Sequence, residues 1–178
     1  DSMYHIETKG LDGKIKMAGI LQDENRDIPG MAKAMTEDFW YTVNGRPVVY
    51  IYNAPKIATK EFIDRINSEL ALAQKDAGKE VTKAYIVGLG VGNKEKAEQC
   101  KANGVEAISW YAFSGSGAAT QTDKKKWDAA GTKIREMKYY QLSKYAKESM
   151  EYMLNNGADL DIMPTITLGY NTMPRIDN

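Results

Sequence analysis

The chain has 178 residues, of which 43% are hydrophobic and 27% charged, the proportions of an ordinary globular domain. Its 24 basic and 24 acidic residues balance, so no net field attracts nucleic acid or an anionic membrane. No segment reaches the roughly 18 consecutive apolar residues of a membrane span, and the single cysteine, Cys100, excludes an intrachain disulfide.

Five short apolar runs predict β-strands that are covered on both faces. They span residues 15–21, 48–52, 84–89, 107–113 and 162–168. Helices are predicted after Pro29, after Thr59 as N-cap, over residues 93–103 with Gly104 as C-cap, and over 134–155. Strands and helices therefore alternate, which predicts right-handed crossovers and a parallel sheet.

Two α/β architectures fit this order: an open doubly wound sheet, or about five of the eight βα units of a parallel (β/α)8 TIM-type barrel. A complete barrel takes about 250 residues. We therefore interpret residues 1–178 as a single domain that forms a partial barrel. An open barrel leaves two sheet edges and an apolar face, which natural proteins cover. A partner copy, as in a homo-oligomer, or a remainder of the barrel is thus expected.

A dense polar segment follows the first predicted strand, where α/β proteins build their sites. Residues 22–27 read Gln-Asp-Glu-Asn-Arg-Asp. One interpretation is a solvated loop in which Asp27 caps the next helix. The other is a carboxylate pair for general acid/base chemistry. Glycoside hydrolysis needs two such groups about 5 to 10 Å apart.

Later strand ends supply candidates for ligand binding. Tyr50 and Tyr52 share one face of the second strand, either as core residues or toward a site, and Asn53 follows them. In the fourth strand, Tyr111 precedes a Ser/Gly-rich loop that is either a plain mobile loop or a lid over a sugar site. The fifth strand leads into Tyr170, Asn171, Arg175 and Asp177. This mixture of ring, amide, cation and carboxylate suits a polyhydroxylated ligand.

Other site classes find no support in the sequence. The glycines at positions 88, 90 and 92 do not complete a dinucleotide fingerprint, and we interpret them as a tight turn before Asn93 as N-cap. His5 is the only histidine and lies in a stretch predicted to be irregular. Neither a histidine-based triad nor a transition-metal site is therefore predicted, and no cofactor is expected.

Three segments resemble, in chain order, motifs of glycoside hydrolase family 99 and of the family 99-like (WbsX-type) proteins. They are Arg-Pro-Val-Val-Tyr-Ile-Tyr at 46–52, Gly-Val-Glu-Ala-Ile-Ser-Trp-Tyr at 104–111, and Met-Pro-Thr-Ile-Thr-Leu-Gly-Tyr-Asn-Thr-Met-Pro-Arg at 163–175. The similarity spans roughly residues 14 to 178.

This resemblance implies a (β/α)8 barrel with endo-α-mannosidase or related activity on α-linked glycans, with retention of configuration and without a metal. It also favours an extracytoplasmic location. Glu24 and Asp23 are the implied catalytic residues. The expected sugar-binding residues are Gln22, Asn53, Tyr111, Tyr170, Asn171 and Arg175.

Two alternatives stay open. One is a non-catalytic glycan-binding or polysaccharide-assembly protein on the same scaffold, and it differs in lacking two carboxylates that face each other across the site. The other is a nucleotide or phosphate binder on an open sheet, which predicts a basic glycine-loop pocket and no tyrosine platform.

Overall fold

We describe the protein from a computed structural model, in which residues 5–9, 15–23, 26–110 and 139–165 are placed. The strands are β1 (His5–Lys9), β2 (Ile15–Leu21), β3 (Thr42–Val43), β4 (Arg46–Ile51), β5 (Tyr85–Leu89), β6 (Ala107–Ser109) and β7 (Asp161–Ile162). The helices are α1 (Ile28–Ala34), α2 (Ala54–Ile57), α3 (Lys60–Asp76), α4 (Lys94–Asn103) and α6 (Tyr139–Asn156). The protein therefore has the α/β class that the sequence predicts.

One sheet holds the strands in the order β1-β2-β4-β5-β6-β7, and β3 pairs with β4 at its side. From β2 to β7 every pairing along this path is parallel, whereas β1 runs antiparallel to β2. The parallel strands thus follow one another in space as they do in the chain. A doubly wound sheet reverses its strand order at a switch point, and the described strands contain no such reversal.

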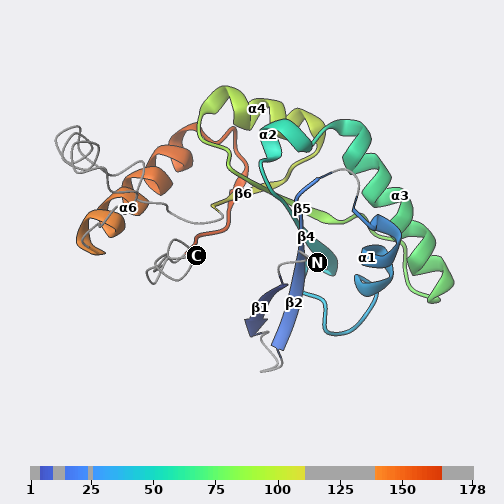
Figure 1. The fold of residues 1–178 in the computed structure, drawn as a ribbon. Helices are drawn as coiled ribbons and strands as arrows, with labels where there is room; N and C mark the ends of the chain where they lie inside the picture. The colour runs from blue at the N-terminus through green and yellow to red at the C-terminus, as the bar shows by residue number, and fades with distance from the viewer. Residues whose placement is uncertain (1–4, 10–14, 24–25, 111–138, 166–178) are drawn as a thin grey trace, which may run out of the picture.

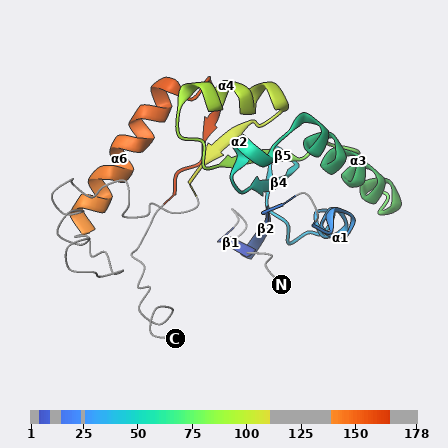
Figure 2. The same ribbon diagram turned by 45° about the horizontal axis from the view of Figure 1, so that its top comes forward.

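The helices cover one face of this sheet. Figure 1 shows α6, α4, α2, α3 and α1 in an arc around the strands, and the turned view of Figure 2 shows the same arc. Right-handed crossovers that always step in one direction place every helix on the same face. Every second residue of each strand points toward the helices. Ile51, Ile86 and Ile108 therefore pack with Ile66 and Met153 of the helices in one buried cluster.

The opposite face carries a second apolar cluster. Its buried members are Ala18, Ile20, Val48, Tyr50, Tyr85, Val87, Leu89 and Ala107. These alternate with the helix-facing residues along each strand, as the two-residue period of a strand requires. Because no helix of the described residues covers it, we call this surface the helix-free face.

Two contacts show that the helix-free face is concave. The Tyr50 hydroxyl on β4 lies 3.8 Å from the sulfur of Met163, which follows β7. The strands β4 and β7 are three positions apart, or about 14 Å along a flat sheet. The Tyr85 hydroxyl on β5 likewise donates to Asp161 Oδ2 on β7 at 2.6 Å, across two strand spacings. Side chains of a strand stand roughly perpendicular to the sheet, so contacts over such spans indicate that the sheet curves toward this face.

Most predicted boundaries of the first three parallel strands and of the helix caps are confirmed. The predicted caps accept or donate as expected: Asp27 and Thr59 accept from backbone N–H groups at the starts of α1 and α3, and Asn93 does so for α4. Gly104 ends α4 in the left-handed region at φ 105°. The glycine-rich segment before Asn93 is the predicted turn between β5 and α4.

Several predicted bounds differ from the structure. The last two parallel strands are short, since β6 ends at Ser109 and β7 at Ile162, and residues 111–138 and 166–178 lie outside the described part. The stretch around His5, predicted to be irregular, is strand β1, which pairs with β2 along its full length. The hairpin of β3 and β4 was also missed, although Asn44-Gly45 carries its signature: both residues have positive φ, as a type I′ turn requires.

Residues 39–43 fill the space between the amino-terminal halves of β2 and β4. These two strands pair directly only from Gly19 to Leu21 on β2. On the amino-terminal side of this paired segment, Tyr41 bridges the two strands. Its N–H donates to Met17 O at 2.6 Å, and its carbonyl accepts from Val48 N at 2.9 Å. The neighbouring Trp40 indole donates to Val48 O at 2.9 Å. The sequence pattern gave no sign of this insertion.

Replacing Gly88 by alanine should destabilise the protein. A Cβ at this position would lie 2.9 Å from Ala54 Cβ and 3.2 Å from Val105 Cγ1, so α2 or the turn before β6 must shift. Overpacking of this kind costs about 1–3 kcal/mol, which urea unfolding would measure. The matched control is Gly92→Ala, where a Cβ meets nothing within 4 Å. Equal unfolding midpoints for the two variants would contradict the tight approach of α2 to β5.

Candidate functional site

The carboxyl-terminal ends of the parallel strands meet at one edge of the sheet. Pairing aligns Leu21 with Ile51 and Ile51 with Gly88, and Leu89 with Ser109. The residues that follow the strands therefore lie along the same edge. They are Gln22 and Asp23 after β2, Tyr52 and Asn53 after β4, Gly90 after β5, Trp110 after β6, and residues 163–165 after β7.

Three of the predicted site residues are thus brought to this edge: Gln22, Asp23 and Asn53. Five others, Glu24, Tyr111, Tyr170, Asn171 and Arg175, lie outside the described residues. The distance between Asp23 and Glu24, on which the predicted catalytic pair depends, therefore stays a prediction.

Two carboxylates of the acidic segment after β2, Asp27 and Asp23, have different partners. Asp27 Oδ1 accepts from Gly30 N at 2.9 Å and caps α1, which confirms the structural interpretation for this carboxylate. Asp23 instead places Oδ2 3.3 Å from Arg26 Nε, and both side chains are partly exposed. An exposed pair of this kind adds at most about 1 kcal/mol to stability. The ion pair instead holds the Asp23 carboxylate close to Arg26 at this edge of the sheet.

Asn53 occupies the left-handed region, with φ 50° and ψ 48°, which asparagine tolerates better than most residues. Its carbonyl accepts from Lys56 N at 2.9 Å and so begins α2, but its side chain makes no capping bond. The neighbouring Gly90 has φ 82°, and a Cβ there would lie 3.6 Å from Asn53 Cα. The turn thus presents an exposed amide beside the end of β5.

Three hydroxyl groups gather around Met163 on the helix-free face. Ser109 Oγ donates to Met163 O at 2.8 Å and lies 3.0 Å from Thr165 Oγ1. Thr165 Oγ1 donates to Trp110 O at 2.7 Å. The third hydroxyl is that of Tyr50, whose contact is the Met163 sulfur. We call Tyr50, Ser109 and Thr165 the hydroxyl cluster.

Sequence reasoning singled out Tyr50 but missed Ser109 and Thr165. Ser109 carries a usable signal, because it is a polar residue in an apolar strand and is only 6% exposed. A buried polar side chain needs partners, which points to a polar neighbour on the same face. Thr165 carries no comparable signal, since its contact with Ser109 depends on the β6–β7 pairing.

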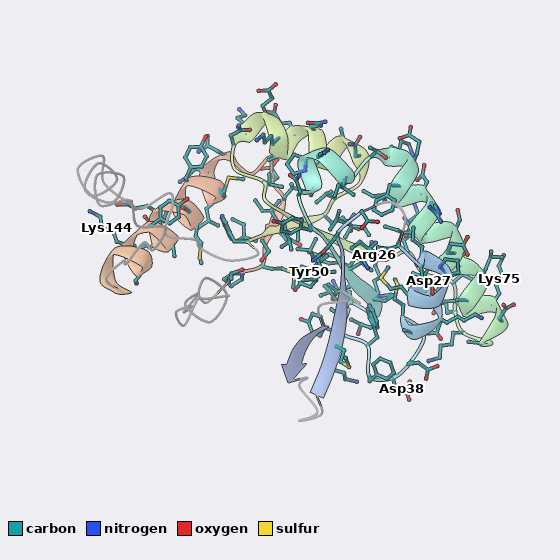
Figure 3. The ribbon with its side chains drawn as sticks, in the orientation of Figure 1. Arg26, Asp27, Asp38, Tyr50, Lys75 and Lys144 are labelled. Atoms are coloured by element: carbon teal, nitrogen blue, oxygen red, sulfur yellow. The ribbon has the colours of Figure 1, made fainter. Side chains whose placement is uncertain are left out.

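Burial raises the pKa of Tyr50, and the neighbouring Tyr41 adds to the effect. The phenol therefore stays protonated through and above neutral pH and acts as a hydrogen-bond donor. In Figure 3, Tyr50 lies on the side of the sheet away from the helices, whereas Asp27 lies at the start of α1.

The amino-terminal edge of the sheet carries a separate polar network. Arg46 donates from Nη1 to Glu106 Oε2 at 2.6 Å and from Nη2 to Glu106 Oε1, which makes a bidentate pair. Its Nη2 also donates to Ala84 O at 2.7 Å, and its guanidinium lies 5.6 Å from the Tyr85 ring centroid. Arg46 belongs to the first family-99-like motif, and here it joins the starts of three strands. Residues at this end of a parallel sheet serve stability.

Three further findings concern the described part of the chain. Within the described ranges, no three His, Cys, Asp or Glu residues are grouped so as to hold a metal ion. Burial raises the pKa of the Cys100 thiol to about 11, so this cysteine is a packing residue of α4 and a poor nucleophile. No helix in the described part of the chain is both long and apolar enough to cross a membrane.

Comparison with models of protein families, with curated proteins and with solved structures finds no match for this chain. The family-99 resemblance therefore depends on the three sequence motifs alone.

Replacing Tyr85 by phenylalanine should reduce the alkaline sensitivity of the fold. Burial first, and then the hydrogen bond to Asp161, raise the pKa of Tyr85 above its ordinary 10.0. The unfolded chain therefore releases this proton at lower pH than the native protein. The stabilisation is complete below pH 10 and is lost as the pH rises further. Denaturant unfolding between pH 8 and 11 measures the slope.

The Tyr85→Phe variant should be about 1 kcal/mol less stable than the wild type at pH 7, since it loses one hydrogen bond to a solvent-accessible carboxylate. Above pH 10 the difference should shrink. A difference that stays constant up to pH 11 would contradict the raised pKa.

Proposed function

We propose that this chain is part of a (β/α)8 barrel whose carboxyl-terminal rim binds and cleaves α-linked, mannose-type glycans with retention of configuration. The single observation that carries the proposal is the concave helix-free face, bridged from β4 to β7 by Tyr50 and Met163. A sheet that bends toward one face, while the described helices cover the other, fits the geometry of a barrel wall.

The direction of the cross-face contacts also supports a barrel. Through the pairing of β5, β6 and β7, Val87 aligns with Asp161. Tyr85, two residues before Val87, therefore reaches two positions further along β7 while crossing two strand spacings. Tyr50 aligns with Val87 and reaches Met163, two positions beyond Asp161, across three spacings. Both contacts therefore run diagonally across the strands, which is compatible with the tilted strands of a barrel.

The rim offers the groups that carbohydrate recognition uses. Asn53 presents an exposed amide, Tyr52 is 42% exposed and presents an aromatic ring, and Gln22 and Asp23 follow the adjacent strand. Rings stack on the C–H faces of sugars, while amides and carboxylates bind their hydroxyl groups. In the proposed mechanism Glu24 is the general acid/base and Asp23 is the second carboxylate. Retention requires these two carboxyl groups to lie about 5–5.5 Å apart.

The second candidate is a glycan-binding protein without hydrolytic activity. The observation that favours it is the ion pair of Asp23 with Arg26. One of the two proposed catalytic carboxylates, that of Asp23, is therefore already paired with Arg26. Asp23 can then serve to hold the loop rather than to catalyse hydrolysis. Under this alternative the rim binds the same glycans and turnover is absent.

The function is tested with α-linked manno-oligosaccharides as substrates and reducing-end release as the readout. Glu24→Gln should lower kcat about 100-fold or more, because general acid/base catalysis contributes 10²–10⁴-fold, and should leave binding intact. Asp23→Asn should also lower kcat. Asp76→Asn is the control, since it removes an exposed carboxylate at the far end of α3.

The outcomes separate the candidates. Wild-type turnover that Glu24→Gln leaves unchanged would remove Glu24 from the mechanism. Wild-type binding without turnover would favour the glycan-binding alternative, and loss of activity in Asp76→Asn would point to damaged folding.

A further inference from the structure

The sequence contains three Asn-Gly dipeptides, at residues 44–45, 103–104 and 156–157. In such a pair the backbone nitrogen of glycine can attack the side-chain amide carbon of asparagine, because glycine has no Cβ that obstructs the approach. Ammonia then leaves and a succinimide ring forms. The three copies share this chemistry, so differences in their reactivity come from the structure around each one.

Two of the copies lie at the ends of helices, where the amide is engaged. Asn103, the last residue of α4, donates from Nδ2 to Ala58 O at 2.9 Å, and Gly104 N donates to a carbonyl of the last helical turn at 3.0 Å. Asn156, the last residue of α6, donates from Nδ2 to Tyr152 O at 2.9 Å. Ring closure at either site must first break the hydrogen bond that holds the amide, which costs free energy.

The copy at residues 44–45 lies in a different environment. Asn44 and Gly45 are both exposed and form the tip of the β3–β4 hairpin, with φ of 51° and 76°. Among the described residues, neither the Asn44 side chain nor Gly45 N has a hydrogen-bond partner. The space beside Gly45 is open, since a Cβ there would meet nothing within 4 Å. Ring closure here therefore needs a rotation within an exposed turn and breaks no side-chain hydrogen bond.

We infer that Asn44 is a modification site, which deamidates in the native protein faster than Asn103 and Asn156. Gly45 N forms a bond to Asn44 Cγ and loses its proton to water, the Cγ–Nδ2 bond breaks, and Nδ2 leaves as ammonia. One water then opens the succinimide. Opening at Cγ gives aspartate, whereas opening at the backbone carbonyl gives isoaspartate, in which the main chain runs through the side-chain Cβ and Cγ.

The isoaspartate product changes the hairpin. It adds one carbon to the main chain of a two-residue turn, whose flanking strands pair Val43 with Arg46. A type I′ turn matches the twist of the strands that it joins, so the longer turn should weaken the pairing of β3 with β4. The modified turn precedes β4 and is thus at the opposite end of this strand from Asn53. The inference is therefore independent of the proposed function.

The test incubates the folded protein at pH 8 and follows the three asparagines by peptide mapping with mass spectrometry. Asn44 should convert about tenfold faster than Asn103 or Asn156, the effect of the hydrogen bonds that the other two sites must break. In denaturant, where these bonds are absent, the three rates should become similar. Equal rates in the folded protein, or faster conversion at either of the other sites, would overturn the inference.

A variant separates the new charge from the longer main chain. Asn44→Asp carries the carboxylate with a normal main chain, and Asp-Gly also suits a type I′ turn. Its Val43 and Arg46 amides should exchange hydrogen as slowly as those of the wild type, whereas the aged fraction with isoaspartate should exchange faster at both. Equal exchange in the aged fraction and Asn44→Asp would overturn the effect on the hairpin and leave the modification site standing.

Discussion

Each crossover after β2 moves the chain by one strand in the same direction, from β2 through β4, β5 and β6 to β7. Because these crossovers are right-handed, this constraint places α1, α3, α4 and α6 on one face, and within the described residues no helix covers the other. The helix-facing cluster then packs as an ordinary core. The helix-free face must bury Val48, Val87 and their neighbours without helices, and its curvature brings Tyr50 and Tyr85 across the sheet to β7.

The two edges of the sheet divide the polar residues between stability and ligand binding. At the amino-terminal edge, the Arg46 guanidinium donates hydrogen bonds to the Glu106 carboxylate and to the Ala84 carbonyl. Its charge is therefore paired within the protein. At the carboxyl-terminal edge, the Asn53 side chain makes no capping bond, and the Tyr50 phenol donates to a thioether sulfur, which is a weak acceptor. Among the described residues, these two side chains thus lie near the edge where the loops of α/β proteins commonly carry binding residues.

The sequence predicted what local chemistry decides. The apolar runs gave β2, β4 and β5 closely, and Thr59, Asn93 and Gly104 mark helix ends through capping. It could not give what depends on pairing. The Ser109–Thr165 contact and the Tyr85–Asp161 bond join residues 56 and 76 positions apart, and no pattern along the chain encodes them. The insertion around Trp40 follows from the incomplete pairing of β2 with β4. Of the predicted site, Gln22, Asp23 and Asn53 share an edge, and Glu24 lies outside the described residues.

The curvature of the helix-free face is tested most directly by an NMR experiment on protein carrying ¹³C-labelled methionine methyl groups. The contact of Tyr50 with Met163 predicts a nuclear Overhauser effect between the Met163 methyl group and the Tyr50 ring, which Met163→Leu abolishes. A flat sheet holds these strands about 14 Å apart, with side chains that stand roughly perpendicular to it, so no such effect is expected there. Its absence, with effects between neighbouring strands present, would contradict a concave wall and the barrel inferred from it.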